Sequence, residues 1–221
     1  MWYHEAGKCQ GFQLEDHRPV EVLTTPRPQL APQRDRYVYG PNTAEVPEGA
    51  AANVRDRSYK IAAEVTVDTD GAQGVLFSHS GRFGDHALFV EDSRLHGVYN
   101  WLGELEREIV SDVDIPTGDV IRGVSFDKEG NDEQPSATGT ATLFINDEQV
   151  GQQSIKTQPG KFTLAGEGLN VGKNPGGLVS TTTYTAPFAL TRGAIREVII
   201  DVSGQTYVDL ELDAIEMMSR D

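Results

Sequence analysis

The regular alternation of apolar and polar residues between Ser58 and Asp68 constrains the fold of this chain more than any other feature. Apolar side chains occupy every second position, at Tyr59, Ile61, Ala63, Val65 and Val67. Successive side chains of a β-strand point to opposite faces, whereas a helix needs a repeat of about 3.6 residues. This segment therefore predicts a strand with one buried face.

Shorter runs that are typical of β-strands follow along the rest of the chain. They cover Gly74–Ser80, Ala87–Val90, Leu95–Asn100, Glu108–Val110, Val120–Asp127, Ala141–Ile145, Gln149–Val150, Phe162–Leu164, Leu169–Val171 and Ala194–Val202. Turns and loops separate them, at Asp70-Gly71, Glu91–Arg94, Lys128–Thr138, Asn146-Asp147 and Gly172–Pro187. Helical spacing is seen in Asp209–Ser219, where Leu212, Ile215 and Met218 share a face. This pattern predicts an all-β, antiparallel two-sheet sandwich with a short C-terminal helix.

The N-terminal part has a different composition. Prolines interrupt it at positions 26, 28, 32, 41 and 47, and each proline favours an extended chain without a backbone donor. We therefore divide the chain into residues 1–18, a Pro-rich arm at residues 19–57 and a β-sandwich domain at residues 58–221. We expect Tyr37, Val38 and Tyr39 to anchor the arm on the folded body.

Charge and cysteine content limit the partners of this chain. Nineteen basic and 34 acidic residues give a formal charge of −15, so neither nucleic acid nor an anionic membrane is an expected partner. The single cysteine, Cys9, excludes an intrachain disulfide. No apolar stretch reaches the roughly 20 residues of a membrane span. Met1–Gln10 lacks the apolar core of a signal peptide, and we expect a cytoplasmic location.

Two predicted hairpins resemble those of a known class of sandwich. They are Ala87–Leu95, continuing to Tyr99 and Asn100, and Leu143–Gly151. Together they resemble concanavalin A-like and laminin-G-like jelly rolls. The resemblance implies that the sandwich is a jelly roll.

A longer series of segments resembles the C-terminal domain of bacterial, notably actinobacterial, arylsulfatases. The segments are Arg34–Tyr39, Val46–Glu48, Asn53–Ser58, Ser80–Gly84, Leu164–Gly172 and Asp201–Gly204. Trp2–Leu14 also resembles the end of a sulfatase catalytic domain. The resemblance implies an accessory domain of a sulfuric-ester hydrolase. Its partner would be a sulfatase catalytic domain in the same or a neighbouring polypeptide.

The catalytic groups of arylsulfatases do not carry over to this chain. The family uses a formylglycine made within a Cys/Ser-x-Pro-x-Arg motif, together with a divalent cation, usually calcium. Here Cys9 is followed by Gln10-Gly11-Phe12-Gln13, which lacks both the Pro and the Arg, and no Ser has the motif either. We therefore expect neither catalysis nor a cofactor in this chain.

Tyr99, Asn100 and Trp101 form the candidate sugar-binding group. Aromatic faces stack on sugars, an amide binds hydroxyl groups, and Tyr99 and Trp101 share one face of a strand. Packing in the core or against another domain is the alternative for the two rings. This group supports a second reading of the chain, a stand-alone carbohydrate-binding module.

Acidic and histidine side chains supply the remaining candidates. Asp68, Asp70 and Asp92 are weak candidates for a calcium site, and the loop around Asp112 and Asp114 is a second candidate site. The alternative for both is that these aspartates form turns and are solvated. If His79, His86 and His96 converged, they would form a metal site. The alternative is that they are loop or sheet-surface residues with ordinary hydrogen bonds. A third reading is a jelly-roll glycoside hydrolase using Glu104 and Glu106, although a solvated charged loop fits these residues better.

Overall fold

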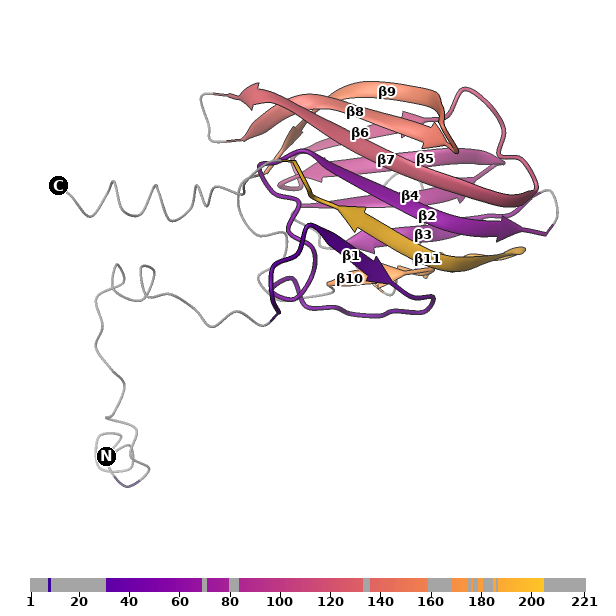
Figure 1. Cartoon of the computed structure of the whole chain (residues 1–221), viewed down its shortest axis with the longest axis horizontal. Coiled ribbons are helices and arrows are strands. Elements are labelled where there is room, and N and C mark those ends of the chain that lie inside the picture. Colours follow the sequence, from indigo (N-terminus) through magenta and orange to yellow (C-terminus); the bar gives the residue numbers. More distant parts are fainter. Residues whose placement is uncertain are drawn as a thin grey trace. The chain divides into compact units, whose positions relative to one another are not determined.

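The computed structural model describes residues 8, 31–68, 71–79, 84–132, 136–158, 168–174, 176, 179–180, 185 and 187–204, and the structural statements below concern these residues. Their strands form two antiparallel sheets, one behind the other (Figure 1). The six-stranded sheet has the order β1 (Arg36–Tyr39), β11 (Gly193–Asp201), β2 (Tyr59–Val67), β7 (Gly118–Asn131), β8 (Ala137–Ile145) and β9 (Glu148–Thr157). The five-stranded sheet has the order β10 (Leu169–Val171), β3 (Gly74–His79), β4 (Asp85–Glu91), β5 (Arg94–Trp101) and β6 (Leu105–Val110). The predicted all-β antiparallel sandwich is confirmed.

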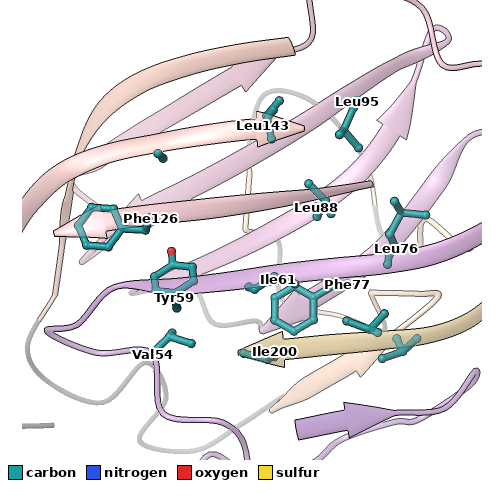
Figure 2. Packing of buried hydrophobic residues seen from close by; sticks show 14 of the residues in the cluster. Val54, Tyr59, Ile61, Leu76, Phe77, Leu88, Leu95, Phe126, Leu143 and Ile200 are labelled. Atoms are coloured by element: carbon teal, nitrogen blue, oxygen red, sulfur yellow. The ribbon is translucent and has the colours of Figure 1, made fainter. Parts of the chain in front are cut away.

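The core lies between the two sheets. The alternation of residues 58–68 is confirmed, because every second residue of β2 is buried. Figure 2 shows Ile61, Phe126 and Leu143 of the six-stranded sheet in one cluster with Phe77, Leu88 and Leu95 of the five-stranded sheet. All six side chains have 0% exposure. Burial of one such side chain contributes about 1.5–3 kcal/mol.

A second apolar cluster covers the outer face of the five-stranded sheet at β3, β4 and β5. It contains Val75, Ala87, Phe89 and Val98 from the strands and Val179 from the segment before β11, with Phe188 packed against it. Asn100 Nδ2 donates to the Val179 carbonyl at 3.1 Å, and the Val75 amide donates to the Phe188 carbonyl at 2.9 Å. Strand β3 is therefore buried on both faces.

The predicted arm contributes a strand to the sandwich. Strand β1 pairs with β11, from Arg36 opposite Asp201 to Tyr39 opposite Val198. The Tyr39 hydroxyl accepts a hydrogen bond from the Ala52 amide at 2.9 Å, and Tyr37 and Tyr39 both pack against the core. The anchoring predicted for these tyrosines is confirmed, whereas Val38 is 56% exposed.

Some predicted boundaries are wrong. Strand β7 continues to Asn131 and β8 begins at Ala137, so the loop predicted at 128–138 is shorter. Strand pairing satisfies the backbone there although the side chains are polar. Strand β6 begins at Leu105 rather than Glu108. The predicted strand at 162–164, the predicted helix at 209–219 and, except for residue 8, the segment 1–18 lie outside the described residues. Within the described part, no helix has the length and hydropathy of a membrane span.

Gly123 in β7 provides the space for an aromatic ring on the outer face of the six-stranded sheet. Phe144 of β8 pairs with Gly123, and the Phe144 side chain is only 7% exposed. A Cβ at position 123 would lie 2.1 Å from Phe144 Cζ and 2.3 Å from the carbonyl oxygen of Ile61. The ammonium of Lys60 lies 4.2 Å from the centre of the ring. The glycine is therefore required by the packing.

The substitution Gly123→Ala is expected to destabilise the fold by about 1–3 kcal/mol, the usual range for overpacking. The backbone of β2 cannot move away from the new methyl group without breaking the sheet. Gly130→Ala is the matched control, because Gly130 lies in the same strand and a methyl group added there would have nothing within 4 Å. Urea unfolding of both variants checks the prediction, and equal midpoints would contradict it.

Two histidines, His79 and His86, lie in the interior between the sheets. Their ring centroids are 5.8 Å apart, and His86 stacks on Tyr99 at 6.2 Å. Loss of hydration, and to a lesser extent the charge of Arg55, lowers the pKa of His79 to about 4. Burial, and then the proximity of His79, lowers the pKa of His86 well below its usual value. Both rings are therefore neutral at pH 7.

Acidification is expected to destabilise the protein through these histidines. The unfolded chain takes up protons below about pH 6.5, whereas the folded chain resists protonation, so stability falls as the pH drops from about 6.5 towards 4. For His79 alone the loss is about 2 kcal/mol at pH 5 relative to pH 7.5. Urea unfolding at the two pH values measures it. The variant His86→Phe should lose less stability than the wild type, and an equal loss would exclude a role for His86.

Candidate binding pocket at one end of the sandwich

A pocket of about 290 Å³ lies where three connections meet at one end of the sandwich. The connections join β2 to β3, β4 to β5, and β6 to β7. The described residues that line it are Val67, Gly71, Ala72, Val90, Ser93, Asp114 and Ile115. They come from strand ends in both sheets and from the loops that follow. The site therefore depends on the packing of the two sheets.

The apolar wall of the pocket continues the core. Val67, Ala72 and Val90 are buried, and Ile115 packs against the same cluster. The Ile115 amide donates to the Ser93 carbonyl at 2.8 Å, which joins the β6–β7 loop to the β4–β5 turn. An apolar wall of this kind can contact the C–H groups of a ligand without losing hydrogen bonds.

Ser111 and Arg122 hold the β6–β7 loop in place. The Ser111 hydroxyl accepts from the Leu95 amide at 3.0 Å and donates to the Val113 carbonyl at 2.8 Å. From inside the core, Arg122 Nη2 donates to the Pro116 carbonyl at 3.3 Å. Arg122 has 0% exposure, and burial lowers its pKa to about 10, so its side chain stays charged at pH 7. The loop is thus supported from both sides.

Asp114 is a charged residue that lines the pocket, and Arg94 forms an ion pair with it. Arg94 Nε lies 2.9 Å from Asp114 Oδ1, and Arg94 Nη1 donates to the Ser111 carbonyl at 2.7 Å. The two side chains are 39% and 73% exposed, respectively, so the ion pair contributes little to stability. Its structural effect is to orient an accessible carboxylate beside an accessible guanidinium.

The turn between β4 and β5 presents Ser93 to the pocket. Asp92 and Ser93 have φ angles of 45° and 64°, so both lie in the left-handed region. Two consecutive residues of this conformation form the turn that best fits the twist of a two-residue hairpin. The hairpin tip predicted at Glu91–Arg94 is confirmed.

The loops that carry both predicted calcium sites converge at this end of the sandwich. Asp68, Asp92, Asp112 and Asp114 are exposed, and Asp70 lies outside the described residues. Among the residues that the structure describes, no three His, Cys, Asp or Glu side chains are grouped so as to hold a metal ion. Calcium binding stays a prediction. His79, His86 and His96 do not converge on one point, because His79 and His86 are buried facing the core whereas His96 pairs with Phe89 on the outer face.

Tyr99, Asn100 and Trp101 lie at the opposite end of β5. Tyr99 is 5% exposed, and its hydroxyl accepts from the Gln158 amide at 2.9 Å. Asn100 is also buried, and its Oδ1 accepts from the Gly103 amide at 2.9 Å. Lys156 Nζ lies 4.1 Å from the centre of the Trp101 ring. The two aromatic rings share a face, as predicted, but this is the inner face, so the predicted exposed stacking platform is absent.

The two predicted catalytic glutamates lie in different environments. Glu104 belongs to the β5–β6 turn, and its amide donates to the Trp101 carbonyl at 3.0 Å. Glu106 belongs to β6, and its carboxylate accepts from the Ser180 hydroxyl at 2.6 Å. The solvated loop predicted for this pair is therefore wrong for Glu106. The hydrogen bond from Ser180 to Glu106 helps to hold the segment that includes Val179 against the outer face of the five-stranded sheet.

A much smaller cavity lies between the sheets. Its volume is about 20 Å³, and Tyr59, Phe77 and His86 are among the residues that line it. This space holds one water molecule at most. The pocket bounded by Ser93 and Asp114 is therefore the larger of these two sites and has the more accessible polar groups.

Comparisons with known proteins give likenesses to solved sandwich structures. No family model matches the chain, and no curated protein is significantly similar to it. Domains LG4-5 of the mouse laminin alpha1 chain are 13% identical over 77% of this chain and 40% of that chain, with a TM-score of 0.47. The CBM40 of Ruminococcus gnavus IT-sialidase, bound to alpha2,3 sialyllactose, is 17% identical over 83% of this chain and 96% of that chain, with a TM-score of 0.47. Domain 4 of AbnA, a GH43 arabinanase from Geobacillus stearothermophilus in complex with arabinotriose, is 16% identical over 81% and 87% of the two chains, with a TM-score of 0.44. None of these comparisons supports the resemblance to arylsulfatases.

Proposed function

We propose that this chain is a non-catalytic jelly-roll module that binds carbohydrate in the pocket bounded by Ser93 and Asp114. The observation that carries the proposal is the combination of an apolar wall with an oriented Asp114–Arg94 pair. Sugars present C–H faces as well as hydroxyl groups. An apolar wall accommodates the C–H faces. A carboxylate accepts hydrogen bonds from sugar hydroxyl groups, and a guanidinium donates hydrogen bonds to them.

The composition of the pocket favours binding over hydrolysis. Glycosidases of the common type need two carboxyl groups about 5–9.5 Å apart on either side of the scissile bond. Among the residues that the structure describes, Asp114 is the one carboxylate lining the pocket. The Asp114 carboxylate lies beside the Arg94 guanidinium, with Arg94 Nε 2.9 Å from Asp114 Oδ1, in an arrangement suited to binding hydroxyl groups.

The substitution Asp114→Asn is expected to weaken sugar binding about 10-fold or more, because hydrogen bonds to charged groups contribute about 1.5–3 kcal/mol. Asp127→Asn is the matched control, since Asp127 is exposed in β7 and does not line the pocket. A glycan array identifies ligands, and calorimetry compares the two variants with the wild type. The absence of any glycan ligand, or equal affinity of all three proteins, would overturn the proposal.

The assignment to an arylsulfatase is the finer proposal. It rests on the segments between Arg34 and Gly204 that resemble the C-terminal domain of that family. The exposed Leu102 and Leu105 of the β5–β6 hairpin, at 41% and 36% exposure, offer an apolar surface on which a catalytic domain could pack. A coding sequence with the Cys/Ser-x-Pro-x-Arg motif, either upstream in frame or in a neighbouring gene, would support it, and the absence of both would exclude it.

The isolated chain is expected to leave aryl sulfate esters unchanged, because the formylglycine motif is missing from its sequence. Release of p-nitrophenol from p-nitrophenyl sulfate, followed by absorbance, measures this. Turnover by purified protein that persists after a second purification step would contradict the non-catalytic assignment.

A further inference from the structure

We infer that the pocket binds the terminal residue of a glycan and not an internal segment of a chain. This inference rests on the proposed function. Three structural features lead to it: the size of the pocket, its position at the end of the strands, and the state of the two outer sheet faces.

The size and position of the pocket suit one sugar residue. Its volume of about 290 Å³ is at the lower limit of small-molecule sites, which span about 300–1,000 Å³. Connections from three pairs of strands border it, and both Val67 and Val90 lie near the ends of their strands. A site bounded by loops in this way accepts a chain end, whereas an internal segment needs a groove that is open on two sides.

The outer face of the five-stranded sheet is occupied over β3, β4 and β5 by the protein itself. Val179 and Phe188 pack on Val75, Phe89 and their neighbours. The Phe89 and Phe188 rings are 6.2 Å apart in an edge-to-face arrangement. The hydrogen bonds from Asn100 to Val179 and from Ser180 to Glu106 fix this cover in place. A glycan chain cannot lie on this face without displacing it.

Among the residues that the structure describes, the outer face of the six-stranded sheet has no exposed aromatic side chain. Phe144 lies against Gly123 beneath Lys60 and is 7% exposed. The large hydrophobic side chains that are exposed in the described part of the chain are all aliphatic: Val38, Leu102, Leu105, Val110, Val113 and Ile121. Stacking along the interior of a polysaccharide requires accessible aromatic faces. Neither sheet face therefore offers a track for a long chain.

The experiment measures how binding depends on chain length and on chain ends. Malto-, cello-, xylo- and chito-oligosaccharides of two to six residues are titrated into the full chain by calorimetry. For each series that binds, the reducing end is converted to the alditol in one sample, and the non-reducing residue is modified in another. The variants Asp114→Asn and Asp127→Asn are titrated with the same ligands.

Terminal recognition predicts one protein per oligosaccharide and affinities within about 3-fold from two to six residues. It also predicts that affinity falls at least 10-fold when one of the two ends is modified. Affinity should fall by the same factor in Asp114→Asn but not in Asp127→Asn. Affinity that rises steadily with length, or that survives both end modifications, would overturn the inference while leaving carbohydrate binding intact. Binding to none of these oligosaccharides, nor to any glycan of the array, would instead overturn the proposed function itself.

Discussion

The packing of two apolar sheet faces against each other is the interaction on which the rest of this structure depends. Ile61 and Phe126 of one sheet and Phe77 and Leu88 of the other are completely buried between them. This contact brings the ends of β2 and β4 together although they belong to different sheets. Without it, Val67 and Val90 would not share a wall, and the pocket would not exist.

A further apolar layer changes the role of the five-stranded sheet. Val179 and Phe188 pack on the outer face of β3, β4 and β5, so this part of the sheet is covered on both sides. A β-sandwich with two open outer faces can bind ligands across either sheet. Here Val179 and Phe188 cover part of one outer face, and on the other face the ring of Phe144 packs against Gly123 and is not available for stacking. The end of the sandwich presents an oriented and accessible pair of charged groups, Asp114 and Arg94.

The candidate site was predictable from the sequence in part. The turn at Asp92-Ser93 and the acidic loop around Asp114 are visible as polar tips between apolar runs, because turn chemistry is local. Their convergence on one pocket with Val67 is not visible, because no local pattern reports which loops meet in space. Local sequence patterns were also insufficient to place Tyr99 and Trp101. Their shared parity follows from strand geometry, but strand β5 carries apolar residues on both faces, so alternation does not indicate which face is inside.

The sequence by itself determined that this chain forms antiparallel strands with turns between them, because a period of two residues and the placement of Gly, Asn and Asp act over a few neighbouring positions. Only the tertiary structure decided that Tyr99 is a core residue and that Ser93 and Asp114 border one pocket. Those outcomes depend on how two sheets and a covering segment pack, and packing joins residues that are distant in the chain.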